Sequence, residues 1–147
     1  MPFLRKELEN ALRIDVVWDR YLDNSLKSLT REKRGGASSR MKVKNDSKMP
    51  KGWQNFLHNN DNKEELFCLF SQKSVNWHTE NFKEVYSTDG CPVLTNSSAN
   101  DTSALSPCNH HEEADTRMMV HVGDAVNKGH SRILIRSVDS DVVVLAV

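Results

Sequence analysis

The chain has 147 residues, of which 37% are hydrophobic and 27% charged, a composition typical of a single globular domain. Its 20 Lys and Arg residues balance its 20 Asp and Glu residues, so the net charge by itself indicates neither a nucleic-acid nor a membrane partner. No apolar stretch approaches the roughly 18 residues of a membrane span, and the first residues lack a signal-peptide core. We therefore expect a protein that is not secreted, has no membrane partner and is intracellular, the nucleus included.

A helix followed by a strand is predicted at the start of the chain. Apolar side chains recur at near-helical spacing in residues 3–12, and residues 14–18 form a short run rich in β-branched residues. This predicted strand ends at Asp19. Because open α/β sheets bind ligands at the ends of their strands, Asp19 is the first candidate site residue.

Positive charge is concentrated in residues 27–51. This segment holds nine basic and two acidic residues around a Gly-rich and Ser-rich stretch that is typical of a linker. A basic segment of this kind would neutralise the phosphates of DNA or RNA. The alternative, which stays open, is a run of solvated charges without a partner.

The middle of the chain predicts a helix and a hairpin. Asp61 and Glu64 have the spacing of a capping box ahead of an apolar helical run. Residues 85–88 and 93–95 flank an Asp-Gly turn, which predicts two short antiparallel strands. Residues 96–108 are rich in Asn, Ser and Thr and are expected to form a loop.

The last segment predicts another helix and then a strand. Asn109 and Glu112 form a second capping box, and the expected helix ends at Gly129. Residues 133–138 are typical of a buried strand, and residues 142–147 form a second apolar run. The side chains expected to face the sheet from the helix are Ala114, Met118, Val122, Ala125 and Val126.

Three carboxylates in this segment are candidate functional groups. Asp115 lies on the helical arc expected to face the sheet, where an unpaired charge would be costly, although it can instead cap amides of the first turn. Asp139 and Asp141 are two residues apart, so both point to the same side of an extended chain. A turn with Asx hydrogen bonds is the alternative explanation for this pair.

A divalent cation would relieve the repulsion among these carboxylates and Asp19. Ligands that are all oxygen atoms suit Mg²⁺ or Mn²⁺, and a pair of such ions supports phosphodiester cleavage. Zinc is not expected, because Cys108, His110 and His111 have no second ligand pair at a standard spacing. The sequence therefore predicts an acidic corner that binds Mg²⁺ or Mn²⁺.

The segment EEADTRMMVHVGDAVNKGHSRILIRSVDSDVVVL resembles the internal region of the flap endonuclease group within the PIN-like nucleases. Residues 113–115 match the acidic helix start of that group, and residues 138–141 match its last acidic element. Upstream, residues 14–19 are similar to the group's strand ending in Asp, and the basic residues that follow are similar to its Lys-rich and Arg-rich arch. The motifs VVWD, SLK, TREKRG, HEEADTR and SVDSD also resemble those of a mobile-element-like animal family over residues 13–147.

The resemblance implies an α/β fold of three layers, PIN-like, with a mainly parallel central sheet that is incomplete at both ends. It implies one partial domain, because the family's first strand has no counterpart before residues 3–12. The expected parts are a strand at 13–19, a basic arch-like arm at 20–51, helices and a hairpin at 53–95, a loop at 96–109 and an acidic helix-strand core at 110–147.

The implied function is that of a nuclease-like domain that uses Mg²⁺ or Mn²⁺ and acts on DNA or RNA. The catalytic residues would be Asp115, Asp139 and Asp141, which would also bind metal with Asp19, Glu112 and Glu113. The resemblance favours Glu113 as a ligand, whereas helical periodicity favours Glu112 or neither. The nucleic-acid-binding residues would be Lys27, Arg31, Lys33, Arg34 and Arg40. The alternative is a catalytically dead module that binds nucleic acid or another protein.

Overall fold

The computed structural model describes residue 6 and residues 9–21, 40–76, 83–106 and 113–146. Within these ranges the chain is mixed α/β, with one small sheet and four helices. In chain order the elements are β1 (Arg13–Val16), α3 (Trp53–His58), α4 (Asn60–Val75), β2 (Glu84–Thr88), β3 (Val93–Thr95), α5 (Ala114–Asn127) and α6 (Asp141–Leu145). Of the helix expected over residues 3–12, residues 6 and 9–12 are described; residues 6, 9 and 10 are helical, whereas 11 and 12 are not.

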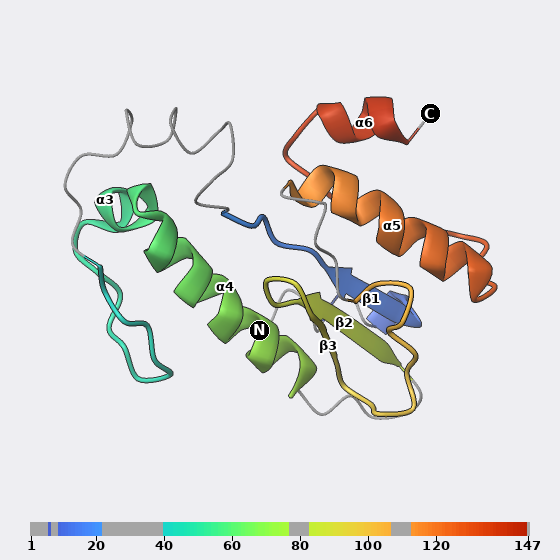
Figure 1. Ribbon diagram of the computed structural model, residues 1–147, viewed down its shortest axis with the longest axis horizontal. Helices are drawn as coiled ribbons and strands as arrows, with labels where there is room; N and C mark the ends of the chain where they lie inside the picture. The colour runs from blue at the N-terminus through green and yellow to red at the C-terminus, as the bar shows by residue number, and fades with distance from the viewer. Residues whose placement is uncertain (1–5, 7–8, 22–39, 77–82, 107–112, 147) are drawn as a thin grey trace.

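The sheet has three strands in the order β1-β2-β3 (Figure 1). β1 pairs with β2 in parallel, and β2 pairs with β3 in antiparallel fashion, so the expected hairpin is confirmed. Gly90 in its turn has a φ of 62°, a value that glycine adopts without steric cost. The described strands thus form a small mixed sheet with one parallel pair, and the mainly parallel central sheet remains a prediction.

The hydrophobic core lies between the sheet and α5. Tyr86 of β2, Val93 of β3 and Leu105 of the following loop are buried together, and Val120 of α5 packs against them. Helix α4 also packs on the sheet, and Ser71 donates a hydrogen bond to the carbonyl of Thr88. Figure 1 shows the sheet between α4 and α5. The stretch between β1 and β2 therefore supplies α4, and the stretch after β3 supplies α5.

The start of α4 differs from the predicted one. Its N-cap is Asn59, whose side chain accepts a hydrogen bond from the amide of Asn62 at 3.3 Å, so the Asp61 and Glu64 capping box does not begin the helix. Asn62 is fully buried and accepts a hydrogen bond from the amide of Met41 at 2.7 Å. This contact holds the beginning of the 40–51 segment against the helices.

Helix α5 begins later than predicted and buries a different face. It starts at Ala114 and has Glu113 as its N-cap, whereas Asn109 and Glu112 lie outside the described residues. Its buried residues are Arg117, His121, Asp124 and Ala125. The expected apolar stripe is therefore wrong: only its Ala125 is buried, and Val126 is 55% exposed. The helix instead turns a polar stripe to the sheet, because β1 and the hairpin turn present charged and carbonyl groups to it.

The expected strand at residues 133–138 is also wrong. These residues follow α5 without regular secondary structure, and Leu134 and Val138 are exposed. Residues 141–145 form the short helix α6, and its Val143 and Val144 are exposed as well. A buried strand needs a neighbouring strand to satisfy its backbone, and none of the described strands pairs with this run.

The loop after β3 is organised by asparagine side chains. The Asn96 carboxamide oxygen accepts a hydrogen bond from the Val85 amide at 2.9 Å, and its nitrogen donates to the Lys83 carbonyl at 2.9 Å. Asn100 donates to Thr95 Oγ1 at 2.7 Å and to Asn96 at 3.3 Å. These asparagines therefore tie the loop to the beginning of β2 and the end of β3.

Replacing Asn96 should destabilise the fold. Asn96→Ala removes both hydrogen bonds to the backbone around β2, and we expect the free energy of unfolding to fall by about 2 kcal/mol, from roughly 1 kcal/mol per lost bond. Chemical denaturation followed by circular dichroism measures this loss. The exposed Asn45 provides a matched control, since Asn45→Ala should change stability by less than about 0.5 kcal/mol. Equal effects of the two substitutions would contradict this role of Asn96.

Candidate functional site

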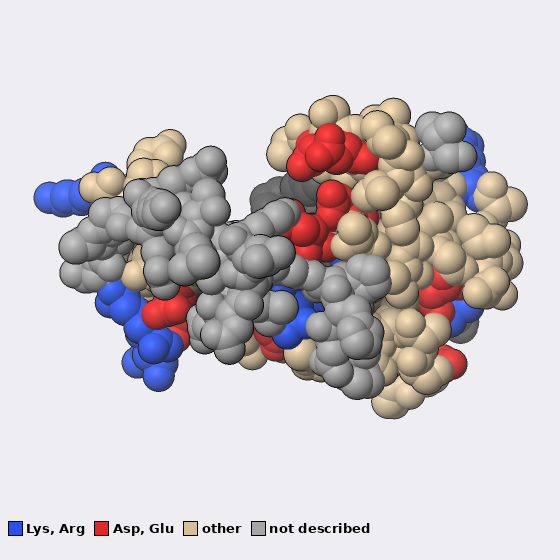
Figure 2. Space-filling model, turned by 45° about the horizontal axis from the view of Figure 1, so that its top comes forward, with Lys and Arg blue, Asp and Glu red and all other residues tan. Residues whose placement is uncertain are grey.

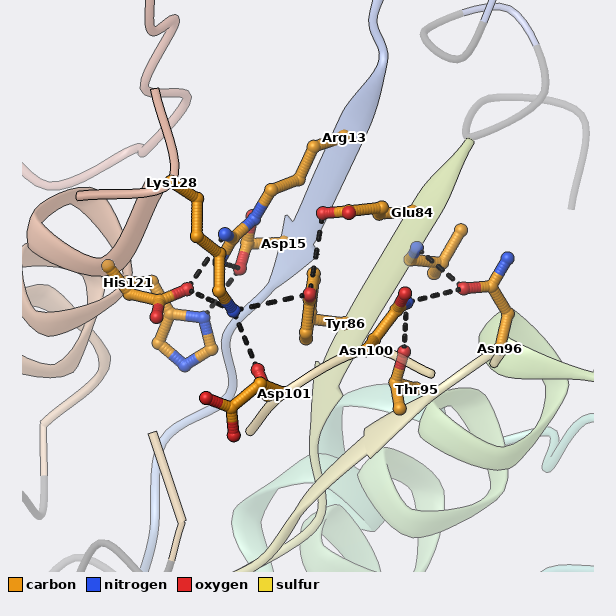
Figure 3. Close-up of polar contacts among 12 residues, drawn as sticks. Arg13, Asp15, Glu84, Tyr86, Thr95, Asn96, Asn100, Asp101, His121 and Lys128 are labelled. Carbon is orange, nitrogen blue, oxygen red and sulfur yellow. Dashed lines mark hydrogen bonds and ion pairs between the residues drawn. The ribbon is translucent and has the colours of Figure 1, made fainter. Parts of the chain in front are cut away.

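A largely buried network of charged and polar side chains joins β1 to α5 (Figure 3). It is made by two residues of β1, two residues of α5, the C-cap residue of α5 and one residue of β2. We call it the β1–α5 network, and its members are Arg13, Asp15, His121, Asp124, Lys128 and Tyr86. Arg13 and Asp15 share one face of β1 because they are two residues apart, and Asp15 is the register partner of Tyr86.

Asp15 is the central acceptor of this network. Arg13 donates to both of its oxygens, from Nε at 2.7 Å and from Nη2 at 2.8 Å. His121 Nδ1 lies 2.7 Å from Asp15 Oδ1. Burial by itself would raise the pKa of Asp15, but the hydrogen bonds from His121 and Arg13 outweigh it, so this pKa lies below its ordinary value. Asp15 is therefore ionised at neutral pH, and His121 donates its Nδ1 proton to it.

Asp124 forms the second half of the network. Its Oδ2 forms an ion pair with Arg13 Nη1 at 2.7 Å, although the two groups are not aligned as a hydrogen bond. The same oxygen lies 3.0 Å from Lys128 Nζ. Lys128 also donates to the carbonyl of Asp101 at 2.6 Å and lies over the Tyr86 ring. Burial lowers the pKa of Lys128, but its bonds to Asp124 and Tyr86 raise it overall. Two cations and two carboxylates thus balance one another, with Lys128 at the exposed edge of the network.

Asp19 lies at the beginning of α5, as α/β packing predicted. Its Oδ1 accepts a hydrogen bond from the Ala114 amide at 2.8 Å, across 95 residues of sequence. The N-cap residue Glu113 makes no side-chain capping bond, so Asp19 provides this cap from another part of the chain. The end of β1 and the acidic start of α5 therefore meet.

The other predicted carboxylates make local hydrogen bonds. Asp115 Oδ1 accepts from the Thr116 amide at 2.6 Å. Asp139 Oδ1 accepts from the Asp141 amide at 3.0 Å, which is the Asx turn considered as the alternative for this pair. Asp139 and Asp141 are exposed and Glu113 and Asp115 are half-buried, whereas Glu112 lies outside the described residues.

The chemistry of these donors fits a hard divalent cation, since every predicted ligand is a carboxylate. Their positions form an acidic region without a finished ligand set: among the described residues, no three His, Cys, Asp or Glu side chains form a group that could hold a metal ion. Figure 2 shows acidic side chains in two neighbouring patches where α5 and α6 lie. The strand and helices that carry the predicted ligands thus come together, but the described side chains do not form a metal site.

The predicted nucleic-acid-binding residues are described only in part. Lys27, Arg31, Lys33 and Arg34 lie outside the described residues. Arg40 is exposed and lies 3.4 Å from Glu65 Oε1 and 3.9 Å from Asp61 Oδ2. Exposed basic residues continue along the chain at Lys42, Lys44, Lys48 and Lys51. Figure 2 shows basic side chains at one end of the molecule with acidic side chains beside them, and further basic side chains elsewhere on the same face.

Sequence reasoning missed the residues of α5 that hold the helix in place. Arg117 is 1% exposed and donates to the carbonyls of Gly90, Cys91 and Pro92 in the hairpin turn. His121, Asp124 and Lys128 continue the same stripe at helical spacing. The sequence does contain a signal, a polar stripe at positions 117, 121, 124 and 128. Apolar periodicity, however, predicts that such a stripe faces solvent.

Comparisons with known proteins do not place the chain in a family. Protein-family models, curated proteins and solved structures were compared, and none matches it. Among the described residues, no helix is long and apolar enough to cross a membrane. The function of the chain is therefore inferred from its own residues.

Acid should weaken the β1–α5 network through Asp15. Because the pKa of Asp15 is lower in the folded protein than its ordinary value of 3.8, its ionised form contributes stability at higher pH, and this contribution is lost as the pH falls through the lower folded value. Urea denaturation between pH 7 and pH 2.5 should show this loss. Asp15→Asn should be less stable at pH 7 and have a shallower acid dependence, whereas the exposed Asp46→Asn should follow the wild type. Parallel curves for wild type and Asp15→Asn would rule out this contribution.

Proposed function

We propose that this chain is a nuclease-like domain that acts on the phosphodiesters of DNA or RNA with Mg²⁺ or Mn²⁺. The proposed metal-binding residues are Asp19, Glu112, Glu113, Asp115, Asp139 and Asp141, which we call the acidic corner. The observation that carries the proposal is the hydrogen bond from the Ala114 amide to Asp19. It brings a carboxylate from the end of β1 to the first turn of α5, next to Asp115.

The geometry of the hydrogen bonds leaves ligand atoms available in the acidic corner. In the described part of the chain, Asp19, Asp115 and Asp139 each accept a backbone hydrogen bond through Oδ1. Their second oxygens can therefore bind a cation while the first oxygens keep their helix-capping and turn contacts. A divalent ion there would supply Lewis-acid stabilisation of charge on a phosphoryl group. The chain's own carboxylates would hold and orient that ion.

The distribution of basic residues supports a polyanionic substrate. The segment 27–51 carries most of its charge as Lys and Arg, and its described part lies away from the acidic patches (Figure 2). Contacts from such residues to backbone phosphates provide affinity and position without reading the sequence of bases. This arrangement separates the surface that would bind phosphates from the carboxylates that would bind metal.

Metal binding should depend on the charge of Asp139. Asp139→Asn keeps the Oδ1 acceptor of the turn to Asp141 but removes the negative charge, so it separates the structural contact from metal binding. We expect Mn²⁺ to raise the melting temperature of the wild type and to do so much less for Asp139→Asn. Cleavage of branched and single-stranded DNA in Mn²⁺ should be lost in the same variant.

The matched control for that experiment is Asp46→Asn, which removes a carboxylate from an exposed turn outside the acidic corner. It should show the wild-type thermal shift and the wild-type cleavage. Absence of both a Mn²⁺ shift and cleavage in the wild type would overturn the metal-dependent activity.

A second candidate function is a catalytically dead module that binds nucleic acid. It is favoured by the absence of a three-ligand group among the described residues, combined with the basic segment. In this case the carboxylates serve only to cap the helix and to stabilise a turn, through their Oδ1 hydrogen bonds. Binding would then depend on the basic residues and be indifferent to the charge of Asp139.

Nucleic-acid binding should be sensitive to salt and to the basic segment. Replacing Lys33 and Arg34 by Ala should weaken binding to DNA or RNA and lower the slope of log affinity against log salt by up to about 2, from roughly 0.9 per phosphate contact. Fluorescence anisotropy over a range of salt concentrations measures both quantities. The control replaces the exposed Arg132 and Arg136 by Ala, which removes the same charge elsewhere. If the wild type binds no nucleic acid even at low salt, a protein-interaction module is the remaining function.

A further inference from the structure

Exposed hydrophobic side chains are concentrated in one stretch of the chain, residues 133–145. Leu134 is 74% exposed and Val138 is fully exposed. Of the ten large hydrophobic residues that are exposed in the described part of the chain, this stretch holds six, which are Ile133, Leu134, Val138, Val143, Val144 and Leu145. Exposed apolar surface of this extent commonly marks a site of interaction with another molecule.

Residues 131–138 also leave backbone groups available for pairing. They lead from the end of α5 toward α6 and belong to no helix or strand (Figure 1). Within the described residues, the amides and carbonyls of residues 131–135 make no hydrogen bond with other backbone groups. A run of strand-forming residues with an unpaired backbone is a template for pairing with another chain. The neighbour that the expected strand lacks can therefore come from outside the chain.

The charges of this region indicate which partner it fits. Arg132 and Arg136 lie in its first half, and Asp139 and Asp141 follow in its second half. Two copies that run antiparallel place the basic half of each copy beside the acidic half of the other, whereas a parallel arrangement places like charges together. An antiparallel pair of identical segments is related by a two-fold axis, so it closes as a dimer. The charge pattern is thus complementary to itself.

A two-fold axis also restricts the register of such a pair, because one residue must face its own copy. An axis at Leu134 or at Arg136 would place arginine directly opposite arginine, which is unfavourable. An axis at Ile135 instead pairs Ile135 with itself, Leu134 with Arg136 and Arg132 with Val138. An axis nearer either end of the run would leave part of it unpaired or would require residues of α6 as partners. The register centred on Ile135 is therefore the favoured one.

We infer that residues 131–139 pair with the same residues of a second copy of this chain, in antiparallel fashion and with the two-fold axis at Ile135. The pairing supplies each run with the neighbouring strand that it lacks within its own chain. It also covers the exposed Leu134 and Val138 with the aliphatic stems of Arg136 and Arg132 of the second copy. This dimer is independent of the proposed metal-dependent activity.

A symmetric cross-link tests the position of the axis. In the paired register the Cβ atoms of the two copies of Ile135 lie about 4.5–5.5 Å apart, whereas the Cα atoms of the two copies of Leu134 lie beyond the roughly 7 Å limit for a disulfide. We therefore expect mild oxidation to cross-link Ile135→Cys into a dimer but not Leu134→Cys. Exposure alone favours the opposite result, because Leu134 is the more exposed of the two. The unchanged chain, oxidised in parallel, shows the contribution of its own cysteines.

Charge at residue 138 tests the pairing of Val138 with Arg132. Val138→Lys places a cation opposite Arg132 of the second copy and Val138→Asp places an anion there, while both remove the same apolar side chain. Because each dimer contains this pair twice, we expect sedimentation velocity to give a dissociation constant about tenfold higher for the Lys variant than for the Asp variant. Met49→Lys, which adds the same charge at another exposed apolar residue, should leave the wild-type constant unchanged.

The outcomes decide the inference directly. A concentration-dependent dimer that cross-links at Ile135 and responds to the sign of the charge at residue 138 supports it. A chain that stays monomeric at every protein concentration overturns it, as do open-ended assemblies, since a two-fold pair closes on itself. A dimer that cross-links equally at Leu134 and Ile135, or that weakens equally with Lys and Asp at residue 138, uses another surface and also overturns it. Circular dichroism confirms that each variant is folded.

Discussion

The structure depends on the ionised Asp15 side chain, which Arg13 and His121 hold between β1 and α5. Its two oxygens take both donors of the Arg13 fork and the Nδ1 proton of His121. An ion pair that is removed from water gains little net stability, but the loss of one partner leaves the other charge buried and uncompensated. The network therefore favours one position and rotation of α5 over other placements of the helix on the sheet. A purely apolar contact would tolerate rotation of the helix more easily.

The same placement of α5 determines where the candidate site residues lie. Two further polar contacts act at the first turn of the helix, from Asp19 to the Ala114 amide and from Arg117 to the hairpin carbonyls. All these contacts link α5 to parts of the sheet that are distant in sequence. The helical turn that carries Asp115 is thus held by tertiary hydrogen bonds, while the side chains of Asp115 and Asp139 each accept a local backbone hydrogen bond. In the described part of the chain these carboxylates form no group that could hold a metal ion.

The buried atom that the network leaves unmatched is His121 Nε2. Its side chain is 3% exposed, and Nε2 has no hydrogen-bond partner in the described part of the chain. A neutral ring that donates Nδ1–H to Asp15 carries only a lone pair at Nε2, which is less costly to bury than an N–H without an acceptor.

The sequence by itself determined those features that depend on neighbouring residues. It determined the β2–β3 hairpin, because an Asp-Gly turn has few other conformations, and the existence of helices α4 and α5, because their residues favour helix over many positions. The meeting of Asp19 with the start of α5 could also be predicted, since strand ends and helix starts lie on the same edge of an α/β fold. Only the tertiary structure decided which face of α5 is buried, because the polar stripe of Arg117, His121 and Asp124 becomes favourable only beside Arg13, Asp15 and the hairpin carbonyls. It likewise decided that residues 133–138 form no strand, because strand formation requires a neighbour whose backbone groups lie within hydrogen-bonding distance, and no local pattern specifies that neighbour.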